Sequence, residues 1–275
     1  MTTTYTQAQT QNLPSQTFAY IIVEDSDHIL TITLNRPEKK NAMNPVMMNE
    51  IVYALNYAHY RNDVWVVLIR ANGDVFSAGA DLKAFAGNKD EKKSTIPVPI
   101  EQVVIGDAFV HLHKPCIARI HGNVYAGAHL IVGGCTHVIA SKSVQFSLPE
   151  VKRGIWPMQV MASLAPLMSS RQLLDYCMRA KSLSAEEAFK RGLVTQIVDS
   201  AELDKAVSDL VEDIKTQSPS AIRLGLKAWD ELKSIEPANQ HKFLLGMLQQ
   251  VLQTEDAAEG LKAFAEKRKP VWKGQ

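Results

Sequence analysis

The chain contains 275 residues, and its 30 lysines and arginines oppose 29 aspartates and glutamates, which leaves a formal net charge of +1. With 46% hydrophobic and 21% charged residues, the composition is that of a folded globular protein, because disordered chains carry far fewer apolar side chains. Nucleic-acid-binding domains are usually clearly basic. The near-neutral charge therefore gives no reason to expect a nucleic-acid partner.

Cysteine usage and the first residues indicate the compartment. Cys116, Cys135 and Cys177 are widely spaced and form no C-x-x-C pair, which favours a reducing environment over a disulfide framework or a zinc ribbon. No apolar run approaches the roughly 18 residues of a membrane span, so no membrane partner is expected. Residues 1–17 contain no charged side chain, unlike a basic secretory signal or an arginine-rich presequence. We expect a flexible polar tail over 1–17 and a cytoplasmic location.

The first half of the chain alternates between β-type and helical segments. Asn44-Pro45 combines an N-cap residue with a proline at the first helical position, which predicts a helix start. A second helix is expected over 101–111. The β-type runs are 18–24, 29–35, 64–69, 116–121 and 137–141. The first two form a hairpin, and the later alternation predicts a parallel sheet with crossover helices.

After Pro157 the pattern changes to one helix after another. Ser184-Ala-Glu-Glu187 has the form of a capping box, and Ser218-Pro219 repeats the cap-then-proline start. The last predicted helices cover 201–216, 219–235, 239–253 and 255–268. We therefore expect an α/β core over residues 18–200, with a helical region over 201–275 that packs on the core or on a neighbouring subunit.

The segment Phe76–Leu82 follows the buried strand 64–69. Ligand sites in open α/β sheets gather at the carboxyl ends of strands. Gly79 stands between alanines, so a ligand can approach the main chain closely, and the N–H of Ala80 could point at a ligand oxygen. The alternative is a tight turn that only needs a glycine.

The segment Gly122–Ala128 also follows a strand and opens an apolar helix, whose N-terminus favours an oxyanion. Its glycine spacing resembles a phosphate loop, but Ala128-His129 stands where Lys-Ser/Thr is required, and the chain has no G-x-G-x-x-G. Nucleotide and dinucleotide binding are therefore excluded. Two backbone donors at neighbouring strand ends suit the enolate of a thioester, since each fixed donor contributes about 2.7–4 kcal/mol in comparable sites.

Proton removal beside a carbonyl also needs a base, and Glu150 is the candidate. It follows Pro149 at the end of a mostly apolar stretch, and burial in an apolar pocket would raise the pKa of its carboxyl and suit it to proton transfer. The alternative, and the commoner situation for a glutamate, is a solvated side chain paired with Lys152 or Arg153.

Histidines and the basic end of the chain offer weaker signals. Five of the eight histidines fall between residues 111 and 137. There is no H-E-x-x-H motif and no carboxylate at ligand spacing on the same helix, so no metal site is expected. The basic run 267–273 is either a solvated helix end or a phosphate contact.

Together these segments resemble the crotonase, or enoyl-CoA hydratase/isomerase, superfamily from about Phe18 to the C-terminus. The segments that carry the resemblance are Asn35–Ala42, Phe76–Leu82, Gly122–Ala128, Leu148–Glu150 with Gly154–Pro157, Leu183–Ala188 with Gly192–Val194, and Phe264–Lys269. The resemblance implies an α/β crotonase-like ββα spiral core with a helical C-terminal trimerisation region. It also implies a homotrimer or hexamer and an acyl-CoA substrate, with coenzyme A carried as part of the substrate and no separate cofactor.

The resemblance assigns roles to particular residues. Ala80 and Gly127 would be the catalytic pair of oxyanion-hole donors, and Glu150 would be the acid/base beside the acyl α-carbon. The residues expected to bind the substrate are Ala42, Ala78, Asp81, Leu82, Lys83 and Lys267. The last of these would meet coenzyme A phosphates, from a neighbouring subunit.

One position departs from the family pattern. Hydratases of the family usually carry a second glutamate three residues beyond the position of Gly127, where this chain has Leu130. Two carboxylates hold and activate water, whereas one suffices to move a proton between carbons, so Leu130 favours enoyl-CoA isomerisation. The alternatives are a true 2-enoyl-CoA hydratase for a branched or unusual acyl group, with Tyr125 or His129 assisting water, and a non-catalytic CoA- or RNA-binding protein. Acyl specificity is expected from the loop over 85–100 and from the lining near Trp156 and Met158.

Overall fold

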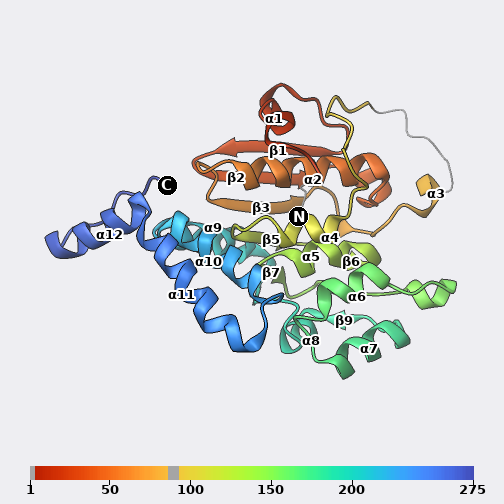
Figure 1. The fold of residues 1–275 in the computed structure, drawn as a ribbon. Coiled ribbons are helices and arrows are strands. Elements are labelled where there is room, and N and C mark those ends of the chain that lie inside the picture. The colour runs from red at the N-terminus through yellow and green to blue at the C-terminus, as the bar shows by residue number, and fades with distance from the viewer. Residues whose placement is uncertain (1–3, 86–92) are drawn as a thin grey trace.

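The computed structural model describes residues 4–85 and 93–275, and these contain two sheets and the helices around them (Figure 1). The larger sheet has six strands in the order β1-β2-β3-β5-β7-β10, and the smaller has four in the order β4-β6-β8-β9. The larger sheet consists of β1 (Ile21–Ser26), β2 (Ile29–Leu34), β3 (Val66–Ala71), β5 (Cys116–Ile120), β7 (His137–Ser141) and β10 (Gln196–Val198). The smaller consists of β4 (Val75–Ser77), β6 (Asn123–Tyr125), β8 (Gln145–Ser147) and β9 (Leu183–Ser184).

The chain visits the two sheets in a repeating order. A strand of the larger sheet is followed by a strand of the smaller one, as in β3–β4, β5–β6 and β7–β8, and helical segments then lead to the next pair. Successive pairs lie side by side and parallel in both sheets. The α/β class with a parallel sheet is thus confirmed, and β1 and β2 form the expected hairpin.

The three helix starts that capping chemistry predicts, at Asn44, Ser184 and Ser218, are all present. The Asn44 side chain accepts a hydrogen bond from the N–H of Met47, and Pro45 occupies the first turn. The helices of the core are α1 (Gln7–Thr10), α2 (Pro45–Tyr60), α3 (Leu82–Phe85), α4 (Ile105–Val110), α5 (His129–Gly134), α6 (Met158–Leu164), α7 (Ser170–Arg179) and α8 (Ala185–Lys190). The later ones are α9 (Leu203–Lys215), α10 (Pro219–Leu232), α11 (Gln240–Leu252) and α12 (Glu255–Glu266).

The larger sheet is covered on both faces. One face contributes to the main apolar cluster with α2 and α5. On the other face, Val66, Ile117 and Ile139 pack against Leu203 and Val207 of α9. Helix α9 therefore packs directly on the core sheet, although the sequence places it in the C-terminal helical region.

The N-terminal segment differs from the expected loose tail. Tyr5 is 0% exposed and Leu13 is 5% exposed. The Tyr5 N–H donates to Asn56 Oδ1 over 2.8 Å, and the Tyr53 hydroxyl donates to the carbonyl of Gln9 over 2.9 Å. From residue 4 onward this segment is packed on α2, because a few apolar anchors outweigh its polar composition.

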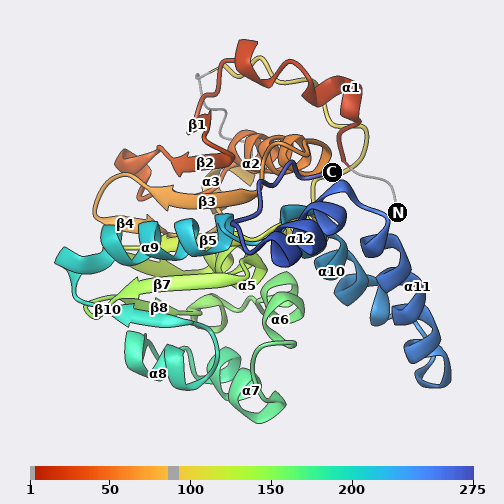
Figure 2. The same cartoon turned by 90° about the vertical axis from the view of Figure 1, so that its left-hand side faces the viewer.

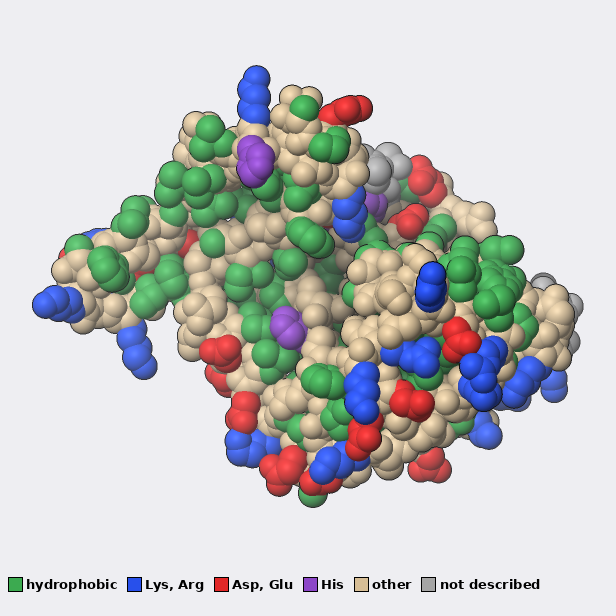
Figure 3. Space-filling view, turned by 90° about the horizontal axis from the view of Figure 1, so that it is seen from below, with side chains coloured by type: hydrophobic (Ala, Val, Ile, Leu, Met, Phe, Trp, Pro, Cys, Tyr) green, Lys and Arg blue, Asp and Glu red, His purple; other side chains and the backbone are tan. Residues whose placement is uncertain are grey.

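Helix α11 projects away from the two sheets in both views of the fold (Figures 1 and 2). Hydrophobic side chains gather on the arm that the C-terminal helices form at the left of Figure 3. The large exposed apolar residues of α11 and α12 are Leu244, Leu245, Leu248, Leu252, Leu261 and Phe264. Within residues 4–85 and 93–275, no helix combines the length and apolar character that crossing a membrane requires.

Candidate active site

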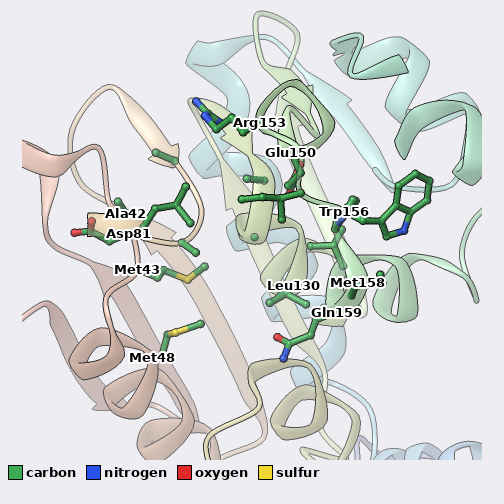
Figure 4. Close-up of a pocket in the computed structure, with 18 of the residues that line it drawn as sticks. Ala42, Met43, Met48, Asp81, Leu130, Glu150, Arg153, Trp156, Met158 and Gln159 are labelled. Atoms are coloured by element: carbon green, nitrogen blue, oxygen red, sulfur yellow. The ribbon is translucent and has the colours of Figure 1, made fainter. Parts of the chain in front are cut away.

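A cavity of about 550 Å³ lies beyond the carboxyl ends of three parallel strands of the smaller sheet (Figure 4). Ala78 and Ala80 follow β4, Ala126 and Gly127 follow β6, and Glu150 follows β8. Because parallel strands end at one edge of a sheet, three segments that are distant in sequence meet there. Each of these strands has only three residues, which is too short for a periodic pattern in the sequence.

The backbone N–H of Ala80 points away from the neighbouring segment at Met43. The Met43 N–H donates to the Gly79 carbonyl over 2.7 Å, and the Asp81 N–H donates to the Met43 carbonyl over 2.9 Å. In this parallel bridge the hydrogen bonds flank Ala80, so its own N–H faces the opposite side. A Cβ placed on Gly127 would lie 3.3 Å from the Ala80 nitrogen. The two backbone donors are therefore close neighbours.

Gly79 makes this close approach possible. Its φ of +85° is a left-handed conformation that favours glycine, and a Cβ there would lie 2.7 Å from the Gly127 nitrogen and 2.8 Å from the Tyr125 carbonyl. The turn that needs a glycine is therefore present, and it also brings the Ala80 and Gly127 segments into contact; approach of a ligand to the main chain at Gly79 stays a prediction.

Glu150 begins a short 3₁₀ helix, Glu150–Arg153, with its side chain directed into the cavity. Its Oε2 atom is buried and has no hydrogen-bond partner among the described residues. Burial raises the pKa of this carboxyl, although a backbone hydrogen bond and the charge of Arg153 oppose the rise. Among the described residues it forms no ion pair with Lys152 or Arg153, and it is therefore available to accept a proton.

The neighbours of Gly127 point in different directions. Leu130 lines the cavity and is 4% exposed. His129 lies outside the cavity lining and is 0% exposed, with Nδ1 2.8 Å from the Ala126 carbonyl and Nε2 2.9 Å from the Tyr176 hydroxyl. The Tyr125 hydroxyl accepts a hydrogen bond from Asn123 and also lies outside the lining. Neither side chain named as a possible assistant for water reaches the cavity.

The predicted substrate-binding residues line the cavity together, with one exception. They are Ala42, Ala78, Asp81, Leu82 and Lys83. Asp81 accepts a 2.8 Å hydrogen bond from Arg36 Nη1. Burial alone would raise the pKa of Asp81. The bond from Arg36 and two backbone N–H groups lower the pKa by more than burial raises it, so the net shift is downward. Lys267, at the end of α12, does not line the cavity of its own chain.

The cavity contains side chains that the sequence did not single out for it. Met43, just before α2, and Met48, in its first turn, face Leu130 and Gln159 on the other side (Figure 4). Arg153 adds a cation beside Glu150. No motif marks these positions, and their only signal is proximity to Ala42 and Glu150 in the chain. Trp156 and Met158 line the cavity as expected, whereas residues 86–92 of the expected specificity loop lie outside the described residues.

Comparisons with known proteins identify the family. Residues 24–275 match the family model of enoyl-CoA hydratase/isomerase. A mevalonyl-coenzyme A hydratase of Aspergillus fumigatus is 30% identical over 250 residues, which cover 90% of this chain and 92% of that protein. A carnitinyl-CoA dehydratase of Salmonella typhi is 30% identical over 255 residues, with 90% and 95% covered. The chain belongs to the enoyl-CoA hydratase/isomerase family.

Solved structures agree with this assignment. An enoyl-CoA hydratase from Mycobacterium tuberculosis H37Rv superimposes with a TM-score of 0.82 at 28% identity, covering 94% of this chain and 100% of that one. An enoyl-CoA hydratase from Bacillus anthracis gives a TM-score of 0.81 at 27% identity, with 93% and 100% covered. The fold is therefore that of the crotonase superfamily, as the sequence resemblance implies.

Proposed function

We propose that this protein isomerises an enoyl-CoA by moving a proton between two carbons of the acyl chain. The proposal rests on the number of carboxylates in the cavity that are free to transfer a proton. Two described carboxylates line it, and Asp81 is bound to Arg36. Glu150 alone remains for proton transfer, because Leu130 stands where a second carboxylate would be.

The residues suggest a balanced sequence of steps. The Glu150 carboxylate would remove a proton from C2 of a 3-enoyl-CoA, and the charge would move to the thioester oxygen as a dienolate. The N–H groups of Ala80 and Gly127 would stabilise that oxygen. The protonated Glu150 would then deliver the same proton to C4, giving the 2-enoyl-CoA and restoring the carboxylate. The apolar Leu130 would keep water from adding to the product.

Hydration of a 2-enoyl-CoA is the second candidate. Two relatives are described as a hydratase and a dehydratase of acyl-CoA compounds. The Gln159 amide lies next to Leu130 (Figure 4). An amide can position a water molecule but cannot take its proton, so a single carboxylate would have to serve for the whole addition.

Two substrates distinguish the candidates. The purified protein is incubated separately with a 3-enoyl-CoA and a 2-enoyl-CoA of the same acyl length, and the products are separated by chromatography and mass spectrometry. Isomerisation predicts conversion of the first to the second with no gain of mass. A product heavier by one water from the 2-enoyl-CoA, formed faster than any double-bond migration, would refute isomerisation and establish hydration.

We also propose that the functional unit is a homotrimer, alone or stacked into a hexamer. The exposed apolar residues of α11 and α12, among them Leu248 and Phe264, would be covered by a neighbouring subunit. Lys267 of one chain would then meet the coenzyme A phosphates bound by another. Sedimentation equilibrium measures the assembly, and a monomer at micromolar concentration would contradict the proposal.

A further inference from the structure

A cluster of two histidines and one aspartate lies outside the active-site cavity. His111 follows α4, His113 lies two residues later in the connection to β5, and Asp230 belongs to α10. One ligand atom from each of the three lies within 4.8 Å of the others. Asp230 lies 119 positions after His111 and 117 after His113, so no local spacing in the sequence could reveal the whole cluster.

The distances suit a bound metal ion. Asp230 Oδ2 lies 3.4 Å from His111 Nδ1 and 3.2 Å from His113 Nε2. Hydrogen bonds between N–H and O are usually shorter, at about 2.9–3.0 Å. Ligand atoms about 2.0–2.1 Å from a tetrahedral zinc ion are separated by roughly 3.3–3.4 Å. The two distances are therefore close to the edges of a tetrahedron around such an ion.

The three ligand atoms contact one another, so a bound ion would replace the long hydrogen bonds that Asp230 Oδ2 forms with His111 and His113. Lys233 approaches the other carboxylate oxygen, Oδ1 of Asp230, at 3.7 Å, so that Oδ2 faces the two imidazoles. The cluster lines a cavity of about 680 Å³ that also includes the carboxylates of Asp107 and Glu231. This cavity gives a cation and its water ligands access to the site, and the nearby negative charge favours entry.

His59 adds an independent observation. It lines the same cavity, and its ring centre lies 5.7 Å from that of His113. Its Nδ1 atom is buried without a hydrogen-bond partner among residues 4–85 and 93–275. Buried polar atoms are usually paired with protein, ordered water or an ion, so His59 adds a polar group that can face a hydrated cation in this cavity.

We propose that His111, His113 and Asp230 bind a divalent transition-metal ion of the Zn²⁺ class, with water in the remaining coordination positions. Two imidazoles and one carboxylate select this class over Mg²⁺ and Ca²⁺, which prefer all-oxygen sites. The ion would join α10 of the C-terminal helical region to the α4–β5 connection of the core. The expectation of no metal site rested on ligand spacing within one helix, whereas these ligands come from different elements and meet only through the fold.

The test is a titration of tag-free, chelator-treated protein with ZnSO₄ in a calorimeter, and with Co²⁺ to record the visible spectrum of the bound ion. We expect one equivalent of metal per chain. His113→Ala and Asp230→Asn should each weaken binding by at least about tenfold, and Zn²⁺ should raise the thermal midpoint of the wild type but not of Asp230→Asn. His241→Ala is the matched control, because this histidine is exposed on α11 and lies outside the cluster.

Any of three results would overturn the site. The first is the absence of saturable binding of one equivalent by the wild type. The second is unchanged affinity in both His113→Ala and Asp230→Asn. The third is an equal loss in His241→Ala, which would indicate unspecific binding to surface histidines. His111→Gln supplies a third ligand variant if one of the others fails to fold, as judged by circular dichroism. None of these measurements depends on the acyl-CoA reaction.

Discussion

The imidazole of His129 donates a hydrogen bond from Nδ1 to the carbonyl oxygen of Ala126 over 2.8 Å. Burial lowers the pKa of His129 to about 4, so the ring is neutral, and because the carbonyl can only accept, the proton is on Nδ1. Nε2 then accepts from the Tyr176 hydroxyl. The Ala126 carbonyl and the Gly127 N–H belong to one planar trans peptide. Fixing the carbonyl on one side therefore directs the N–H to the other.

His129→Leu removes this orienting bond. We expect kcat to fall by about tenfold to a hundredfold, less than the loss of a whole donor, while KM changes little because the cavity lining is retained. The free energy of unfolding should drop by about 1–3 kcal/mol, since the Tyr176 hydroxyl loses its partner and the Ala126 carbonyl keeps only the backbone N–H of residue 129. Steady-state kinetics measure kcat and KM, and urea denaturation measures the free energy of unfolding. Tyr176→Phe keeps the bond to Ala126 and should lose less activity; an unchanged kcat in His129→Leu would contradict the orienting role.

Gly79→Ala places a Cβ 2.7 Å from the Gly127 nitrogen at a φ of +85°. Strain and overpacking together should lower the free energy of unfolding by about 3 kcal/mol or more and abolish most activity. Gly154→Ala is the matched control, because its φ is +70° but no atom of the described residues lies within 4 Å of the added Cβ. It should cost about 1–2 kcal/mol. Equal losses in the two variants, measured by denaturation, would show that the contact with Gly127 is unimportant.

Glu150→Gln removes the proposed acid/base while keeping the shape of the side chain. Turnover should fall by about 10²–10⁴-fold with little change in KM. Glu186→Gln, at an exposed position in the first turn of α8, is the control and should retain wild-type kinetics. If Glu150→Gln turns over its acyl-CoA at a rate near the wild type, Glu150 is not the base.

The raised pKa of Glu150 should be visible in stability as well as in rate. The pKa of Glu150 in the folded state lies above the ordinary value of 4.5. At a pH between the ordinary pKa and the raised pKa, Glu150 is more often protonated in the folded state than in the unfolded state. The contribution of Glu150 to stability therefore falls as pH rises through that window. In denaturation experiments, wild type should lose stability relative to Glu150→Gln as the pH rises above 4.5. The acid limb of kcat/KM should likewise lie above 4.5, and a limb at or below that value would contradict burial of the catalytic carboxyl.

Leu130→Glu restores a second carboxylate beside the cavity. We expect hydration of a 2-enoyl-CoA to increase relative to isomerisation, because the new carboxylate can hold and activate water. Leu130→Gln is the control for side-chain size without a base. If the ratio of hydrated to isomerised product is the same in both variants, Leu130 does not decide the reaction. Product analysis by mass spectrometry gives the ratio directly.

Local sequence chemistry determined much of the fold. The strand Val66–Ala71 and the helix that begins after Asn44 follow from the continuous apolar run 64–69 and from a cap-proline pair, each a signal within a few residues. The motif around Gly79 also indicated the family, and Leu130 showed that this chain departs from the two-carboxylate pattern of the family's hydratases. Such signals are available because backbone conformation and capping depend on near neighbours in the chain.

Only the tertiary structure decided which of these residues meet. The short strands β4, β6 and β8 bring Ala80, Gly127 and Glu150 to one cavity, and nothing local specifies three-residue strands whose stability comes from pairing with distant partners. The same limit hid the burial of Tyr5 against α2 and the meeting of His113 with Asp230. Composition described residues 1–17 as polar, and local spacing separated the histidines from any carboxylate, because contacts between distant segments are set by packing of the whole chain.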